Sequence, residues 1–382
     1  MSFKEVYITK TANFLPNEPV SNDEMEAYLG LINGKPSKSR RIVLRNNGIK
    51  RRFYAITKEG KATHTNAQMT ALAVKALFKN NPSALEQVDL LSCGTSSPDQ
   101  LMPSHGVMVH GWLPESGAIE VVSPSGVCCA GMHALKYAYM AIRTGAASLA
   151  VSTGSERLSR VLRSDVFEEE VQKLIALEQN PFVGFEKEFL RWMLSDGAAA
   201  FLLSSQKNEA DLNLKIEWLE GVSYANKMEP CMYMASDKMA DGSLKSYMDY
   251  TPEEILEQSI FSMKQDVKLL SEYIVPLGGI RLKAIFEEKG IKAHDIDYFL
   301  PHMSSNFFRN KIAEQLVLNG MEIPQEKWFT NLETMGNVGA GSIYLMVDEL
   351  FNSGKLKKGQ KILMLVPESS RFSYMYALLT VC

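Results

Sequence analysis

The chain has 382 residues, of which 46% are hydrophobic and 22% charged, and its formal net charge is −3. This length predicts one large folded unit or two fused ones, and the near-neutral charge gives no overall reason to expect nucleic acid binding or membrane insertion. The N-terminal residues carry charge where a signal peptide needs an apolar stretch, and no apolar run approaches the ~18 residues of a membrane span, so we expect a cytoplasmic protein.

The cysteines are odd in number, and their spacing matches neither a metal site nor a disulfide framework. The five are Cys93, Cys128, Cys129, Cys231 and Cys382. We therefore expect free thiols and no structural metal, which leaves one of the thiols available for reaction.

Short apolar strands alternate with helical segments along the whole chain. In the first half, strands are predicted at 88–92, 148–152 and 198–203, with a helix directly after Cys129. In the second half, they are predicted at 214–222, 296–300, 361–366 and 372–379, with a helix after Asn337. This alternation predicts mostly parallel sheets that are covered by helices.

The two halves of the chain repeat each other at a constant spacing. Asp89 and Asp297 lie in similar apolar strands 208 residues apart, and Cys129 and Asn337 are also 208 residues apart. A register that is held over such a distance indicates two copies of one α/β unit.

We therefore predict two pseudo-symmetric halves, residues 1–210 and 211–382. Two segments, 156–191 and 228–250, do not fit the duplicated pattern, and we interpret them as insertions. Insertions of this kind commonly lie over a site or at a subunit boundary.

Cys129 is the candidate nucleophile. It lies in Gly126-Val127-Cys128-Cys129-Ala130-Gly131, between a predicted strand and a predicted helix. The free N–H groups and the dipole at a helix start favour an anion and lower a thiol pKa, so this position predicts a reactive thiolate. A buried cysteine pair is also explained by packing alone, so the assignment depends on partner residues elsewhere.

Two polar residues in the second half are candidate partners. His302 follows the predicted strand 296–300, at the carboxyl edge where parallel sheets place ligands. Asn337 stands at the pseudo-symmetric equivalent of Cys129, where an amide can donate a hydrogen bond toward a common point. Together the three residues predict a site for nucleophilic catalysis.

These motifs and their order resemble the β-ketoacyl-acyl-carrier-protein synthase III group of condensing enzymes. The segments that carry the resemblance are Gly48-Ile49-Lys50-Arg51-Arg52, Cys129-Ala130-Gly131, Ser195-Asp196-Gly197-Ala198, Pro301-His302, Gly336-Asn337 and Leu356-Lys357-Lys358-Gly359-Gln360. The resemblance implies a five-layered α/β/α/β/α thiolase fold, a homodimer and a ketosynthase with the catalytic triad Cys129, His302 and Asn337. It implies no cofactor beyond the phosphopantetheine of acyl carrier protein or coenzyme A that carries the substrates.

The same resemblance assigns further residues. The backbone N–H groups of Cys129 and Ser370 are the implied oxyanion donors, and Met102 and Phe307 the implied acyl-pocket residues, with Met102 reaching the partner's pocket. Contacts to the carrier or to pantetheine are implied for Arg45, Arg51, Arg52 and Arg309. The stretch 35–52, with eight basic residues and no acidic one, is either an electrostatic docking patch or a solvated loop.

Within this group, residues 14–25 and 45–50 resemble the ketosynthases of bacterial dialkylresorcinol and flexirubin pigment pathways. That implies coupling of a β-ketoacyl thioester with an α,β-unsaturated acyl thioester to a 2,5-dialkylcyclohexane-1,3-dione. Two alternatives share the nucleophile: a malonyl-dependent synthase that initiates fatty acid or polyketide chains, and a cysteine acyltransferase that makes esters or amides.

The sequence departs from the group's pattern at three places. Pro367-Glu368-Ser369-Ser370-Arg371-Phe372 replaces a Gly-rich turn, and Ile42 stands where coenzyme A-primed members often carry Trp. The loop Thr95-Ser96-Ser97 lacks the glutamate that related non-decarboxylating families use as a base. The base for such a step is therefore unassigned, with His302 as the default.

Overall fold

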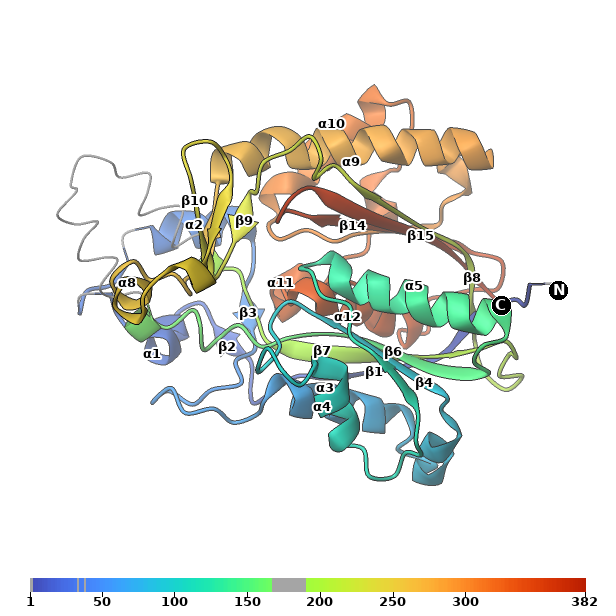
Figure 1. Ribbon diagram of the computed structural model, residues 1–382. Coiled ribbons are helices and arrows are strands. Elements are labelled where there is room, and N and C mark those ends of the chain that lie inside the picture. Colours follow the sequence, from blue (N-terminus) through green and yellow to red (C-terminus); the bar gives the residue numbers. More distant parts are fainter. Residues whose placement is uncertain (1–2, 33, 38, 167–189) are drawn as a thin grey trace.

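The computed structural model describes residues 3–32, 34–37, 39–166 and 190–382. Helices and strands alternate in five layers, with two helices enclosed between two sheet layers (Figure 1). The enclosed helices are α5 (Cys129–Thr144) and α12 (Ser342–Phe351). The outer layers are formed by α3 (Asn66–Leu77) and α4 (His105–Gly111) on one side and by α9 (Val267–Lys289) and α10 (Phe307–Leu318) on the other. The predicted five-layered α/β arrangement is confirmed.

Among the described residues, nine strands form the two sheet layers. The first half contributes β1 (Tyr7–Phe14), β4 (Leu90–Thr95), β5 (Glu120–Val122), β6 (Leu149–Glu156) and β7 (Gly197–Ser204). The second half contributes β8 (Leu214–Ser223), β13 (Tyr298–Pro301), β14 (Lys361–Glu368) and β15 (Ser373–Val381). Their order is β13-β14-β15-β8-β1-β7-β6-β4-β5, so the two layers join where β8 pairs with β1.

The expectation of mostly parallel sheets is wrong. In the described residues, β4 is parallel to β5 and β6, and β13 is parallel to β14. The remaining pairs of the large sheet are antiparallel. One physical reason is the short link between β14 and β15, residues 369–372, because so few residues can connect only antiparallel neighbours.

The enclosed helices approach each other closely because small residues lie at their starts. A Cβ added to Gly131 would lie 2.4 Å from the carbonyl oxygen of Ala340, and one added to Gly154 would lie 2.3 Å from the same atom. Only glycine permits these backbones to meet. The contact places the loop before α5 and the loop before α12 side by side, which is where the site residues lie.

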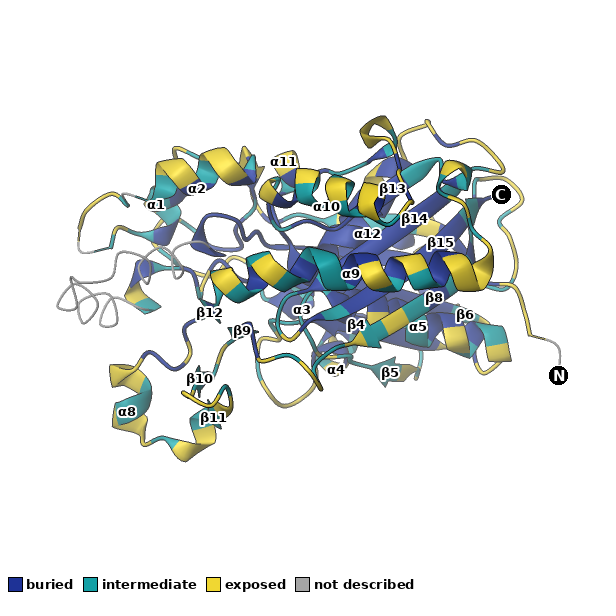
Figure 2. Ribbon diagram, turned by 90° about the horizontal axis from the view of Figure 1, so that it is seen from above, coloured by how far each residue is buried: buried dark blue, intermediate teal, exposed yellow. Residues whose placement is uncertain are grey.

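The outer helices bury one face and expose the other. Figure 2 shows buried strands beneath α9, whose outer side is exposed. No helix among the described residues combines the length and the apolar character that crossing a membrane requires.

Of the two predicted insertions, only the second lies wholly within the described residues. Most of 156–191 lies outside the described residues, although Glu156 itself ends β6. The segment 228–250 contains β9 (Met232–Tyr233), β10 (Ser236–Lys238) and β11 (Leu244–Ser246), which lie beyond one end of the large sheet (Figure 1).

Candidate active site

Adjacent residues of β14 bind two of the predicted catalytic residues. The Cys129 thiol donates to the carbonyl oxygen of Val366 at 3.3 Å, and the His302 backbone N–H donates to that of Leu365 at 2.8 Å. Cys129 is the first residue of α5, and His302 directly follows β13. Cys129 and His302 therefore lie at a helix start and a strand end, beside neighbouring residues of β14, and their catalytic roles stay predictions.

The predicted thiolate at Cys129 is wrong for this arrangement. Burial raises the pKa of the Cys129 thiol well above its usual value, and the nearby Glu368 carboxylate raises it further. The Cys129 side chain is only 1% exposed. The helix start does favour an anion, but the anion that occupies it is Glu368.

Glu368 is bound directly at the start of α5. Its Oε2 atom accepts hydrogen bonds from the backbone N–H groups of Val127, at 2.8 Å, and Cys129, at 2.9 Å. Its Oε1 atom accepts one from the Ser370 hydroxyl at 2.8 Å. Sequence analysis missed this role, since the only signal was the acidic residue in an altered Gly-rich turn.

His302 is neutral in this environment. The residue is buried, and burial lowers the pKa of its imidazole to about 4. A neutral imidazole keeps one N–H donor and one acceptor nitrogen. His302 can therefore donate a hydrogen bond to a carbonyl oxygen at neutral pH.

Asn337 is held by its backbone and by its side-chain oxygen. Its N–H donates to the carbonyl of Met193, and its Oδ1 atom accepts from the N–H of Gly339 at 3.0 Å. Because the oxygen is engaged by the loop, the side-chain NH2 group is the end available as a donor to the neighbouring cavity.

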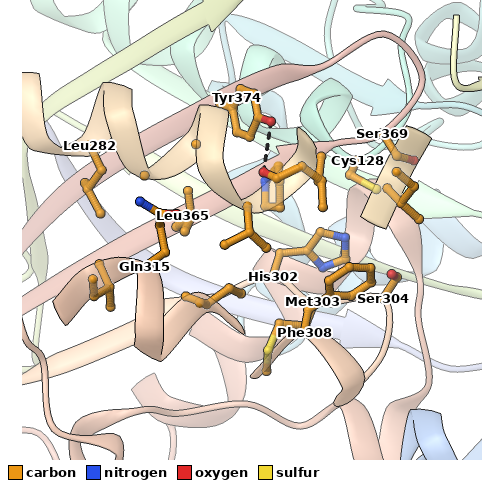
Figure 3. A pocket seen from close by; sticks show the side chains of 18 residues that line it. Cys128, Leu282, His302, Met303, Ser304, Phe308, Gln315, Leu365, Ser369 and Tyr374 are labelled. Carbon is orange, nitrogen blue, oxygen red and sulfur yellow. Dashed lines mark hydrogen bonds between the residues drawn. The ribbon is translucent and has the colours of Figure 1, made fainter. Parts of the chain in front are cut away.

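Two adjoining cavities lie beside His302 and Asn337. The His302 cavity, of about 690 Å³ including its open mouth, is lined by His302 and by apolar side chains of α9, α10 and β14. Figure 3 shows Cys128, Ser369, Ser304 and His302 at one end of it and Leu282 and Gln315 at the other. The Asn337 cavity, of about 770 Å³ on the same measure, is lined by Asn337 and by side chains that include Met232, Met234 and Met263.

Cys128, Ser304 and Ser369 line both cavities and so form their common wall. Sequence analysis did not single out these residues. Cys128 faces the cavities, whereas the Cys129 thiol points to Val366. Cys129 therefore has to rotate its side chain before it can meet a substrate in either cavity.

The predicted acyl-pocket residues lie elsewhere in this chain. Phe307 is exposed, and the next residue, Phe308, lines the His302 cavity, so this assignment is corrected to Phe308. Met102 is 87% exposed, on the loop before α4, and its predicted place in the partner subunit's pocket stays a prediction.

The four arginines that were predicted to contact the carrier differ in their exposure to solvent. Arg45 and Arg51 are exposed. Arg52 is fully buried and donates to Asn22 and to the carbonyl of Trp192, so its assignment as a docking residue is wrong. Arg309 is partly buried and donates to Gln325. The Ser370 carbonyl accepts from the N–H of Cys231, and the oxyanion role of its own N–H stays a prediction.

A second buried glutamate lies behind the site. Glu156 accepts hydrogen bonds from the backbone and hydroxyl of Ser96, from the hydroxyls of Ser97 and Thr95, and from the N–H of Ala340. Burial raises the pKa of Glu156 to about 7. This carboxylate ties the loop after β4 to the loop before α12.

Comparison with known proteins agrees with this geometry. Residues 286–366 match the family model described as 3-oxoacyl-[acyl-carrier-protein] synthase III C terminal. β-Ketoacyl-[acyl-carrier-protein] synthase III of Clostridium perfringens is 26% identical over 356 residues, which cover 92% of each chain. The corresponding enzyme of Aquifex aeolicus is 24% identical and covers 94% of each chain.

Solved structures show the same fold. The tetronic acid condensing enzyme AbyA1 superposes with a TM-score of 0.76 at 21% identity, over 98% of this chain and 99% of that one. OleA of Xanthomonas campestris, solved with bound lauric acid and lauroyl-CoA, has a TM-score of 0.74 at 18% identity over 99% of both chains.

Proposed function

We propose that this chain, which is similar to synthase III condensing enzymes and has their fold, joins two acyl thioesters through an acyl-Cys129 intermediate. The first partner, which acylates Cys129, is an α,β-unsaturated acyl thioester, and the second, which forms the enolate, is a β-ketoacyl thioester. The product is a 2,5-dialkylcyclohexane-1,3-dione, as in dialkylresorcinol-type pigment biosynthesis.

The two cavities are the observation that carries this proposal. Each is large and mostly apolar, and they meet at Cys128, Ser304 and Ser369 with His302 on one side and Asn337 on the other. A reaction between two long acyl chains needs two such spaces, whereas a malonyl unit is small and charged. OleA, a neighbour in fold, binds lauric acid and lauroyl-CoA, so this fold can accommodate long acyl groups.

The mechanism begins at Cys129. The Cys129 sulfur attacks the first thioester, backbone N–H groups stabilise the tetrahedral oxyanion, and the carrier leaves as a thiol with the proton that the Cys129 thiol gives up. The second thioester then places its carbonyl oxygen against His302 and Asn337, whose hydrogen bonds stabilise the enolate. One enolate carbon of the second chain attacks the acyl-cysteine and releases Cys129, and a second enolate carbon of that chain adds to the β-carbon of the unsaturated chain and closes the ring. Hydrolysis then frees the carrier thiol, and the thioester carbon is lost as CO2. Binding both chains in adjoining cavities makes this encounter local.

The partners follow from this chemistry. Both substrates are carried on the phosphopantetheine of acyl carrier protein or coenzyme A, and Arg45 and Arg51 are exposed and so accessible to that carrier. The thioester exchange and proton transfer require no metal or redox cofactor.

We further propose a homodimer whose interface includes the surface around α3 and α4. Large apolar side chains are exposed there, namely Leu72, Leu101, Met102, Val107 and Trp112. A second copy of the chain is the occupant that would cover them. Light scattering after size-exclusion chromatography tests this, and a monomer would contradict it.

Intact-protein mass spectrometry tests the nucleophile. Wild type incubated with a medium-chain α,β-unsaturated acyl thioester should gain one acyl adduct, which Cys129→Ala should lack and Cys128→Ala should retain. The Cys128 variant is the matched control, since its thiol is adjacent and lines both cavities. An adduct that follows Cys128 instead would reassign the nucleophile.

Product analysis tests the reaction. Addition of a β-ketoacyl thioester to the acylated enzyme should yield the cyclic dione. An adduct that turns over only with a malonyl thioester would move the function to chain initiation, and an ester or amide formed without a new carbon–carbon bond would make the protein an acyltransferase.

A further inference from the structure

Glu368 is a carboxylate that the mechanism above does not use, although it contacts the nucleophile's own backbone. It is the last residue of β14, and its side chain turns toward the start of α5. It accepts three hydrogen bonds: those from the N–H groups of Val127 and Cys129 connect the two halves of the chain, and the third comes from the Ser370 hydroxyl in its own half.

No cationic side chain of the described residues neutralises this carboxylate. Glu368 is 7% exposed and forms no ion pair there. Its charge is stabilised by two backbone N–H groups at the start of a 16-residue helix and by one hydroxyl. A buried carboxylate with so few donors can be displaced at moderate cost.

The Cys129 N–H cannot serve Glu368 and the reaction at the same time. When Cys129 attacks a thioester, its own backbone N–H is the donor nearest to the developing oxyanion. That N–H is bonded to Glu368 Oε2 at 2.9 Å in this structure. Formation of the acyl-enzyme therefore requires the Glu368 carboxylate to leave this position.

A displaced Glu368 has space beside it. A Cβ added to Gly126 would lie 3.4 Å from Glu368 Oε2, and Gly126 and Val127 line the Asn337 cavity, so the carboxylate lies directly behind residues of that cavity's wall. Asn337, one of the two donors to the second thioester's enolate, lines the same cavity. The carboxylate thus emerges beside the carbon that has to lose a proton.

We propose that Glu368 is the base of the non-decarboxylative condensation, occupying the oxyanion site of Cys129 at rest and being released from it by acylation. The inference rests on the proposed function, because only a substrate without a carboxyl group to lose requires a base. It replaces His302, which is left as a hydrogen-bond donor to the enolate oxygen.

The proton and the electron pairs balance in this scheme. The Glu368 carboxylate removes the α-proton of the second thioester, and the electron pair of the broken C–H bond forms the enolate. The enolate carbon forms the new bond to the acyl carbonyl carbon, and the bond from that carbon to the Cys129 sulfur breaks. The departing thiolate takes the proton from the Glu368 carboxyl, which returns as a carboxylate to the N–H groups of Val127 and Cys129.

The test separates the two half-reactions in Glu368→Gln, which keeps the size of the side chain and removes the base. Acyl-enzyme formation, followed by intact mass, should stay within about threefold of wild type, because the neutral Gln amide accepts from the N–H groups more weakly than a carboxylate and is also displaced by the oxyanion. Consumption of the acyl-enzyme by the second thioester should slow by at least about 100-fold, the usual contribution of a general base. Deuterium exchange at the α-carbon of that thioester should fall by a similar factor.

Glu322→Gln, at an exposed position outside the site, is the matched control and should behave as wild type. Glu368→Asp keeps a carboxylate and serves if the Gln variant does not fold: acylation should persist while consumption slows by about tenfold. Wild-type consumption in Glu368→Gln, or an equal loss in both half-reactions of either variant, would overturn the inference and leave the proposed function standing. A wild type that forms no acyl adduct would overturn both.

Discussion

Glu156 and Glu368 occupy corresponding places in the two halves of the molecule but differ in their surroundings. Glu156 ends β6 and binds the N–H of Ala340, in the second half, whereas Glu368 ends β14 and binds the N–H of Cys129, in the first. Each carboxylate therefore reaches across the pseudo-symmetric interface to the loop that precedes the other half's enclosed helix.

The difference between them is in donors and burial. Glu156 is completely buried and accepts five hydrogen bonds, four of them from the loop Thr95 to Ser97. Glu368 accepts three and retains some exposure beside the cavities. We therefore expect Glu156 to keep its position between the two halves, whereas Glu368 is the carboxylate that can be displaced.

Removal of each carboxylate should have unequal effects on stability. In Glu156→Ala, the Ser96 and Ser97 hydroxyls and the Ala340 N–H lose a buried acceptor, and at about 1–3 kcal/mol for each unsatisfied group the free energy of unfolding should fall by at least about 3 kcal/mol. Glu368→Ala should cost only about 1 kcal/mol, since water from the cavities can reach its donors. Urea unfolding measures both, and equal losses would contradict the distinction.

Between pH 5 and pH 8, one contribution to the pH dependence of stability should come from Glu156. Burial raises the pKa of this carboxyl from 4.5 to about 7 in the folded protein, so the folded state holds a proton that the unfolded state has released. The stabilising contribution is complete below pH 4.5 and is lost as the pH rises through 7.

Wild type should therefore lose about 2 kcal/mol relative to Glu156→Gln between pH 5 and pH 8. Denaturant unfolding of both proteins at the two pH values provides the measurement. Glu368→Gln is the comparison and should keep the pH dependence of wild type. A pH dependence that is lost in Glu368→Gln and kept in Glu156→Gln would come from Glu368 and would contradict this prediction.

Much of the fold could be predicted because local hydrophobic patterns indicate where its strands and helices lie. Apolar strands recur at a spacing of 208 residues, and β4, β6 and β14 lie within a few residues of their expected positions. Strand direction could not be predicted in the same way. It depends on how each strand is connected to its neighbour, and the short link before β15 makes that pair antiparallel.

The site was predictable in position but not in ionisation. Cys129 and His302 were placed correctly because helix starts and strand ends are visible in sequence. The state of the Cys129 thiol depends on Glu368, which is 239 residues away in the chain. No local sequence pattern predicts a contact between residues so far apart in the chain. Local patterns also could not show that Phe308, and not the predicted Phe307, lines the cavity.

The smallest effect concerns the thiol itself. Burial is the larger cause of the raised pKa of Cys129, and the negative charge of Glu368 is the second, with Cys128 adding to it. In Glu368→Gln the charge disappears while the burial remains, so the pKa of Cys129 should fall and still stay above that of an ordinary thiol. The pH midpoint of iodoacetamide alkylation, located at Cys129 by peptide mass spectrometry, should therefore move to lower pH in this variant.

Glu156→Gln should leave the midpoint closer to wild type, because Glu156 acts on Cys128 but is not among the groups that shift the pKa of Cys129. A midpoint that is unchanged or higher in Glu368→Gln would show that the carboxylate does not suppress the nucleophile at rest.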